Sequence, residues 1–404
     1  MKRGFLSQYF SGIAAKRLSA VEAHKHRSNQ HEFDAVTSLK SILGPSIPRK
    51  QFKARFVYLN DELPEPVVAD GFLTWYDARE RHPTRSESRL YFPSTPVSEQ
   101  AAEDDLLVLA RRPDDSLLLV VAESGSTAES QIRWLFGITG ETAPDFSIKG
   151  EAESDRVKLE FASRFILEQI GIEVDETDEN RLEAMLEKFG GGFPSTREFS
   201  AYARGTLRDV SADDDADTVI MAWIEREEIL FRTLERYLIR GRLKSGFGDD
   251  VDSFVAFSLS VQNRRKSRAG SALENHLESL FVGRKIKHSR TPRTEGKSRP
   301  DFVFPGEMEY RNPAFPAVKL TMLGVKSSCK ERWRQILPEA DRIPHKHLLT
   351  LEPGISEAQT AEIEAKQVQL VLPAPVHGTY SLLQRKRLMT VEVFLDYVLQ
   401  LQSN

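Results

Sequence analysis

The chain has 404 residues, of which 40% are hydrophobic and 29% charged, and its formal net charge is −4 at pH 7. This length predicts two or three domains of a soluble globular protein, and the charge excludes a basic field over the whole molecule. The single cysteine, Cys329, excludes an intrachain disulfide and a cysteine-rich zinc site, and it is typical of a reducing cytoplasm. We expect no membrane span, because every apolar run is too short, and no signal peptide, because Ser7 and Gln8 interrupt the first apolar residues.

Residues 1–145 are predicted to form a β-rich domain with short helices. Residues 52–59 alternate apolar and polar side chains, as a half-buried strand does. Two apolar runs, 106–110 and 117–122, are joined by a segment that contains Pro113 and Asp114, which favour a turn. The two runs are therefore predicted to form a hairpin.

Arginine and aromatic side chains are concentrated in residues 73–93 of this domain. The aromatic residues Trp75 and Tyr76 are followed by Arg79, Arg81, Arg85 and Arg89. Arginine contacts phosphates and base edges through paired hydrogen bonds, so this composition indicates a DNA-binding loop. The alternative is a charged surface loop whose aromatic side chains belong to the core of the domain.

Residues 146–215 are predicted to be a helical linker region. The segments 157–170 and 177–189 carry apolar residues at helical spacing, and three glycines at 190–192 end the second segment. An acidic run follows at 212–217. The glycines and the acidic run are the two candidate domain boundaries.

Residues 216–404 are predicted to form an α/β domain with a mixed sheet flanked by helices. Long helical patterns cover about 218–242 and 272–281. Strands are expected at 302–304, 318–325, 347–351 and 368–372, and helices at 331–336, 356–366 and 391–401. The alternation of strands and helices is typical of an α/β fold.

The most basic run of the chain lies just before the second of these helices. It contains Arg264, Arg265, Lys266 and Arg268. We interpret these side chains as phosphate contacts, and the alternative is a solvated helix start.

Three charged residues suggest the chemistry of this domain. Asp301 opens one apolar run, Lys326 ends the next, and Glu339 follows on a predicted helix. If the two runs are neighbouring strands, the carboxylates can hold Mg²⁺ while the lysine adds charge beside an attacking water, which suits phosphodiester hydrolysis. The pair alone is weak support, because many strands end in charged residues, and Asp341 is close enough to replace Glu339.

Four runs of residues, in order, resemble the catalytic domain of the EcoRII-type restriction endonucleases. These runs are 263–270, 300–302, 325–337 and 339–341. The resemblance covers roughly residues 190–400. It implies a restriction-endonuclease-like core, and Mg²⁺-dependent cleavage of double-stranded DNA at a palindromic site of the CC-GG type.

The resemblance also implies roles for individual residues. In that family's layout, Asp301 and Glu339 are the metal carboxylates, Lys326 is the catalytic lysine, and a supporting acid falls on Glu274. The block that reads C:G pairs falls on Lys330, Glu331 and Arg332. Such a role is sensible, because arginine can pair with guanine and a carboxylate can accept from cytosine. A palindromic site further predicts a homodimer.

Residues 1–145 match no motif of that family. The enzyme that gives the family its name has a separate DNA-binding effector domain that restrains its nuclease. By analogy, we expect residues 1–145 to sense DNA or to restrain cleavage, and a second, effector DNA is a possible partner of this domain. The alternative for the whole chain is a DNA-binding sensor or regulator with a degenerate nuclease core, and the complete acid–lysine–acid set argues against that alternative.

Overall fold

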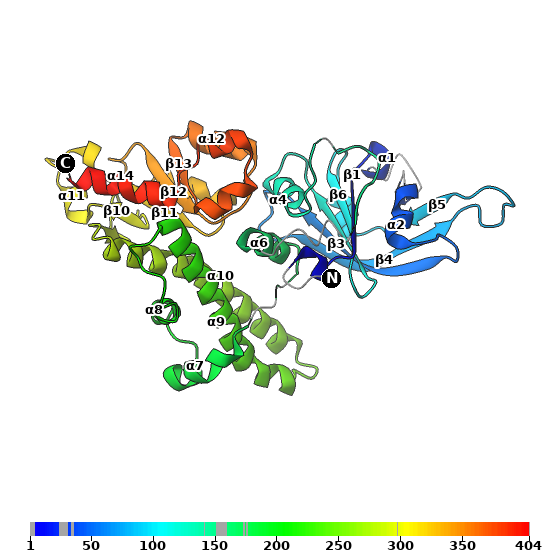
Figure 1. Ribbon diagram of the computed structural model, residues 1–404, viewed down its shortest axis with the longest axis horizontal. Coiled ribbons are helices and arrows are strands. Elements are labelled where there is room, and N and C mark those ends of the chain that lie inside the picture. The colour runs from blue at the N-terminus through cyan, green and yellow to red at the C-terminus, as the bar shows by residue number, and fades with distance from the viewer. Residues whose placement is uncertain are drawn as a thin grey trace. The chain divides into compact units, whose positions relative to one another are not determined.

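The computed structural model describes most of the chain as two compact units. The described residues are 5–23, 31–33, 36–140, 142–150, 160–172, 174, 177–296 and 298–403, without the side chains of Lys149, Gly150, Lys330 and Glu331. The first unit is Met1–Val174 with Pro353–Gln359, and the second is Asp175–Glu352 with Thr360–Asn404. The division at residue 174 falls inside the segment that was predicted to be a helical linker (Figure 1).

An eight-stranded sheet forms the first unit, in the order β2-β5-β4-β3-β7-β6-β1-β8. Its strands are β1 (Gly12–Arg17), β2 (Glu32–Phe33), β3 (Lys50–Leu59), β4 (Val67–Asp77), β5 (Ser88–Tyr91), β6 (Leu106–Arg111), β7 (Leu117–Ala122) and β8 (Ser147–Gly150). Only β3 and β7 pair in parallel, and all other neighbours are antiparallel. The predicted strand at 52–59 and the hairpin at 106–122 are confirmed as β3 and the β6–β7 pair.

Both faces of this sheet carry a hydrophobic core, because alternate side chains of its strands point to opposite sides. Along β3, Phe56 belongs to one core, whereas Val57 belongs to the other. The second core includes Ile132 and Ile166. These residues come from α4 (Thr127–Leu135) and α6 (Phe161–Gln169). The short helices are η1 (Leu6–Gln8), α1 (Ala20–Ala23), η2 (Val36–Leu39), α2 (Lys40–Leu43) and α3 (Pro96–Gln100).

The second unit begins with helices. They are η3 (Glu179–Arg181), α7 (Leu182–Phe189), α8 (Thr196–Gly205), α9 (Ala216–Ser245) and α10 (Val251–Gly283). Gly190 ends α7 with a φ of 66°, a left-handed conformation that suits glycine. Ser195 and Glu198 form a capping box at the start of α8. Because α10 begins at Val251, the basic run lies in the interior of a helix, which corrects the alternative of a helix start.

A five-stranded mixed sheet follows, in the order β13-β12-β11-β10-β9. Its strands are β9 (Ser289–Arg290), β10 (Phe302–Phe304), β11 (Thr321–Lys326), β12 (Lys346–Thr350) and β13 (Val368–Val371). The pairs among β9, β10 and β11 are antiparallel, and those among β11, β12 and β13 are parallel. The predicted α/β class is therefore confirmed. The strand that was predicted over 318–325 starts only at Thr321, because a 3-10 helix, η4 (Ala317–Lys319), precedes it.

Helices α10 and α14 (Val391–Ser403) pack against strand β10 of this sheet. The remaining helices are α11 (Glu307–Arg311), η5 (Lys330–Ile336), α12 (Glu357–Ala365), η6 (Ala374–Thr379) and α13 (Leu382–Arg385). Phe281 of α10 packs edge-on against Phe302 and Phe304 of β10, with ring centroids 5.1 and 5.2 Å apart. Phe394 of α14 also contacts Phe304.

Within the described residues, no helix combines the length and the apolar character that a membrane crossing requires.

Candidate active site

Asp301 and Lys326 meet where β10 and β11 pair. Phe302 lies opposite Leu323 in antiparallel register, which places Asp301 opposite Gly324. Side chains alternate between the faces of a strand, so Asp301, Gly324 and Lys326 project from the face opposite to Phe302. Lys326 Nζ lies 2.9 Å from Asp301 Oδ2, and the backbone N–H of Val325 donates to the same oxygen at 2.6 Å. The two side chains are only 12% and 17% exposed, so the pair is weakly screened.

Glu339 completes this arrangement from the turn after η5. Burial raises the pKa of Glu339 to about 7, while Lys326 lowers it and Asp301 raises it further. The three charges are therefore close enough to act on one another. Glu339 Oε2 is buried and accepts no hydrogen bond from the described residues. Asp341, the sequence alternative to Glu339, is exposed.

Gly324 allows η5 to lie directly on β11. A Cβ atom at this position would come within 2.7 Å of Ile336 Cγ2, which is closer than real carbon contacts. Ile336 and Trp333 are fully buried and anchor η5 against the sheet. The close approach brings Glu339, three residues after Ile336, near Lys326.

The donor set fits a divalent metal such as Mg²⁺. Asp301 and Glu339 supply two carboxylates, and each keeps one oxygen without a hydrogen bond from the described residues. Mg²⁺ prefers oxygen ligands and is commonly held by one or two carboxylates, with water and phosphate at the other positions. No group of three or more His, Cys, Asp or Glu side chains in the described residues is arranged to hold a metal.

Glu274, the predicted supporting acid, forms an ion pair with Arg290. Arg290 lies in β9, opposite Phe302 of β10. Its guanidinium contacts the carboxylates of Glu274 and Glu278, both at 2.8 Å. The structure thus pairs Glu274 with Arg290 on the face of the sheet opposite to Asp301, and does not bring it to the Asp301–Lys326 pair. Sequence reasoning missed Arg290, because a single arginine in a two-residue strand gives no pattern.

The basic run of α10 is largely engaged with α9 and its surroundings. Arg268 is buried, contacts Glu227 and Glu228 of α9, and lies over the ring of Phe231. Its predicted role as a phosphate contact is therefore corrected, since a phosphate cannot reach a buried guanidinium. Arg265 pairs with Glu235 at 2.7 Å, and Arg264 lies over the ring of Phe193 at 4.0 Å. Lys266 is exposed.

The arginine-rich segment of the first unit forms the β4–β5 hairpin. Trp75 is fully buried and donates from Nε1 to the Gly44 carbonyl at 3.0 Å, so it belongs to the core, as the alternative interpretation had it. Arg79 and Arg89 each pair with Glu87 at 2.6 Å. Arg81 and Arg85 are exposed at the tip and form no ion pair with any residue that the structure describes.

The predicted base-reading block lies on η5, next to β11. Lys330 and Glu331 belong to this helix by their backbone, but their side chains lie outside the described residues. Arg332 is exposed. Cys329, just before the block, is fully buried, and burial raises the pKa of its thiol, so it is a packing residue rather than a nucleophile.

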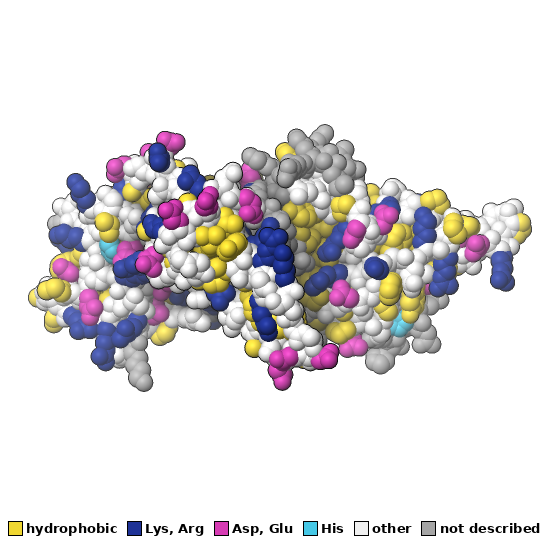
Figure 2. Space-filling view, turned by 90° about the horizontal axis from the view of Figure 1, so that it is seen from below, with side chains coloured by type: hydrophobic (Ala, Val, Ile, Leu, Met, Phe, Trp, Pro, Cys, Tyr) yellow, Lys and Arg dark blue, Asp and Glu magenta, His cyan; other side chains and the backbone are white. Residues whose placement is uncertain are grey.

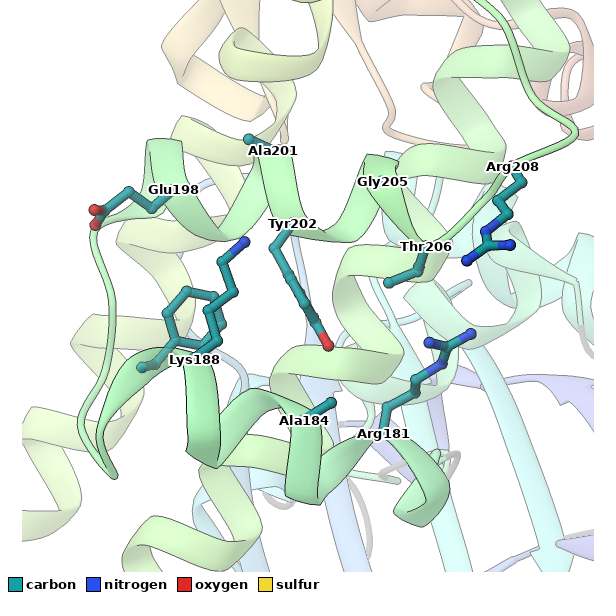
Figure 3. A pocket seen from close by; sticks show the side chains of 10 residues that line it. Arg181, Ala184, Lys188, Glu198, Ala201, Tyr202, Gly205, Thr206 and Arg208 are labelled. Atoms are coloured by element: carbon teal, nitrogen blue, oxygen red, sulfur yellow. The ribbon is translucent and has the colours of Figure 1, made fainter.

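A pocket of about 650 Å³ lies between α7 and α8, and none of the predicted site residues lines it. Figure 3 shows the guanidinium groups of Arg181 and Arg208 on the same side of it as the Tyr202 hydroxyl. On the face of the molecule in Figure 2, Lys and Arg side chains are interspersed with Asp and Glu side chains, in keeping with the net charge of −4.

Comparison with known proteins identifies the part of the chain that contains this site. Residues 231–395 match the family described as EcoRII C terminal. The chain is 39% identical over 226 residues to the type II restriction enzyme EcoRII of Escherichia coli, a match over 56% of this chain and 55% of that enzyme. The chain therefore matches about half the length of this curated relative. Asp301, Lys326 and Glu339 all lie within residues 231–395, the part of the chain that is similar to the C-terminal region of EcoRII.

Two solved structures share a weaker similarity with the chain. One is metal-depleted Ecl18kI in complex with uncleaved, modified DNA, which is 20% identical with a TM-score of 0.45 and covers 56% of this chain and 85% of that chain. The other is metal-depleted Ecl18kI in complex with uncleaved DNA, which is 22% identical with a TM-score of 0.41 and covers 55% and 84%.

Proposed function

We propose that this protein is a type II restriction endonuclease that cleaves double-stranded DNA with Mg²⁺ at a palindromic site of the CC-GG type. The observation that carries the proposal is the Lys326–Asp301 pair, 2.9 Å long, beside the unpartnered carboxylate oxygen of Glu339. All three residues lie inside the region that matches the EcoRII C-terminal family.

The chemistry of the proposed reaction follows from what each side chain can do. Bound Mg²⁺ would offset negative charge on the scissile phosphate and favour a hydroxide nucleophile. Asp301 and Glu339 would hold the ion through their free oxygens. Lys326, fixed by Asp301, would keep its positive charge next to the attacking water. Glu274 would act on the site only indirectly, because its ion pair with Arg290 lies on the face of the sheet opposite to Asp301.

DNA recognition is proposed to involve η5 and the tip of the β4–β5 hairpin. Lys330, Glu331 and Arg332 would read C:G pairs from η5. In the first unit, exposed Arg81 and Arg85 would contact a second, effector DNA, since they retain unpaired guanidinium groups in the described part of the chain. A two-fold DNA site calls for a two-fold protein, so the active form is proposed to be a homodimer.

Replacement of the lysine tests the proposal. Lys326→Ala should lower the rate of Mg²⁺-dependent cleavage of double-stranded DNA at least about a hundredfold, because a charge positioned at the reacting phosphate is lost. DNA binding, measured by fluorescence anisotropy, should be kept. Lys366→Ala is the matched control, since Lys366 is an exposed lysine of the same unit. Cleavage by Lys326→Ala at the wild-type rate would refute the role of Lys326, whereas a wild-type protein that shows no metal-dependent nicking or cleavage of DNA would favour the degenerate nuclease core.

A further inference from the structure

The segment that leads into Asp301 is tied to the turn that follows Glu339. Glu295 lies between β9 and β10, and Tyr310 lies in α11 with only 3% of its surface exposed. The Tyr310 hydroxyl donates to Glu295 Oε1, and Glu295 Oε2 accepts from the backbone N–H of Asp341 at 3.3 Å. The hydroxyl oxygen of Tyr310 also accepts from the backbone N–H of Arg342 at 3.3 Å. One half-buried carboxylate and one hydroxyl therefore join two segments that are distant in sequence.

Lys346 fixes the same turn from the opposite side. This lysine begins β12, is 7% exposed, and donates from Nζ to the carbonyls of Ile343 at 2.9 Å and Ala340 at 3.3 Å. Ala340 has a φ of 53°, which residues other than glycine rarely adopt. A residue keeps such an unfavourable φ only where the surrounding contacts hold its backbone in place. Around Ala340, these contacts are the hydrogen bonds of Lys346 and of the Glu295–Tyr310 pair.

Arg342 connects the turn to α11 itself. Its guanidinium donates to the carbonyls of Asn312 at 3.0 Å and Phe315 at 2.8 Å, and to that of Tyr310. The turn after Glu339 is thus bound to α11, and α11 follows β10, the strand that Asp301 precedes. Hydrogen bonds therefore connect the backbone that leads to Asp301 with the backbone that follows Glu339.

The carboxyl of Glu295 is a charged acceptor in this network. Burial alone would raise the pKa of Glu295, but hydrogen bonds from Tyr310 and Asp341 lower it below its usual value. An ionised acceptor forms stronger hydrogen bonds than a neutral one. The contact is consequently stronger than a bond between two neutral groups.

We propose that Glu295 and Tyr310 are positioning residues that fix the separation of Asp301 and Glu339 and thereby set the affinity for a divalent cation. Neither side chain hydrogen-bonds to Asp301, Lys326 or Glu339, so they act only through the backbone. Mg²⁺ demands near-ideal octahedral geometry, and small errors in the spacing of two ligands weaken its binding. This inference rests on the proposed function, because it takes the two carboxylates to be metal ligands.

Tyr310→Phe in the full chain tests the inference, since it keeps the ring in place and removes only the hydroxyl. Mn²⁺ binding, followed by electron paramagnetic resonance of the free ion, should weaken about tenfold, as is usual when groups behind metal ligands are removed. The Mg²⁺ concentration for half-maximal cleavage should rise by the same factor. The KM for DNA should stay unchanged, and the rate at saturating Mg²⁺ should return to within about threefold of wild type.

Two further variants keep the test decisive. Glu295→Gln retains an acceptor for the hydroxyl but loses the charge, so its Mn²⁺ affinity should lie between those of wild type and Tyr310→Phe. Tyr397→Phe is the control, because the hydroxyl of this half-buried tyrosine has no hydrogen-bond partner in the described residues, and its affinity should equal that of wild type.

The possible failures are distinguishable. Unchanged Mn²⁺ affinity in Tyr310→Phe, or a lower rate that saturating Mg²⁺ does not restore, would overturn the positioning role while leaving the proposed function intact. Wild-type protein that shows no metal-dependent cleavage would overturn the proposed function, and this inference with it.

Discussion

Lys326 Nζ lies 2.9 Å from Asp301 Oδ2; Lys326 ends β11, and Asp301 directly precedes β10, which pairs antiparallel with β11. This contact leaves the second oxygen of Asp301 available for a metal. Asp301→Asn keeps the size of the side chain and an oxygen acceptor for Lys326, but it removes the negative charge. We expect a loss of at least about a hundredfold in Mg²⁺-dependent cleavage and weaker Mn²⁺ binding. Plasmid cleavage and a Mn²⁺ titration measure the two effects, and a variant that binds Mn²⁺ as wild type does would contradict the ligand role.

Glu339→Gln should separate stability from activity. The pKa of Glu339 is raised to about 7 in the folded protein, so folding is favoured at low pH, and that contribution is lost as pH rises through 7. In metal-free protein at pH 8, the ionised carboxylate costs up to about 3 kcal/mol. Glutamine removes this cost, so the variant should resist urea better than wild type at pH 8, with little difference near pH 4.5. Cleavage should nevertheless be lost. Equal urea midpoints of the variant and wild type at pH 8 would show that ionisation of the Glu339 carboxyl does not destabilise the fold.

Gly324→Ala should damage the site without changing any charge. The new methyl would lie 2.7 Å from Ile336 Cγ2, so η5 must move away from β11 and carry Glu339 with it. We expect a loss of about 1–3 kcal/mol in stability and a lower rate of cleavage. The double variant Gly324→Ala with Ile336→Ala removes the clashing atom and should recover part of the rate. If the double variant is no faster than Gly324→Ala, the clash is not the cause.

His347 should make the protein sensitive to acid. It is buried in β12, and burial lowers its pKa to about 4, while histidine in the unfolded chain has a pKa of about 6.5. Between these values only the unfolded state binds the proton, so stability falls as pH drops from 6.5 to 4, by about 3 kcal/mol in total. His347→Gln should lose less stability over this range. Urea unfolding at pH 7.5 and pH 4.5 compares the two proteins, and parallel losses would exclude this role of His347.

The sequence by itself determined the α/β class of the second unit and pointed to the three charged residues that we propose as its site. Strand β10, strand β13 and helix α14 follow from runs of apolar residues whose spacing is local information. Asp301, Lys326 and Glu339 were found because each stands at the end of such a run or in the resembling motifs. The hairpin of β6 and β7 was predictable for the same reason, since a short turn between two apolar runs requires no distant contact.

Only the tertiary structure decided what these side chains touch. The register of Phe302 with Leu323 brings Asp301 to Lys326, and the bare Cα of Gly324 brings η5 and Glu339 beside them. Arg268 appears in the sequence as a free cation, yet packing of α10 on α9 buries it against Glu227 and Glu228. These contacts join residues that are far apart in the chain. Their geometry depends on which helix covers which strand, and local spacing does not encode that choice.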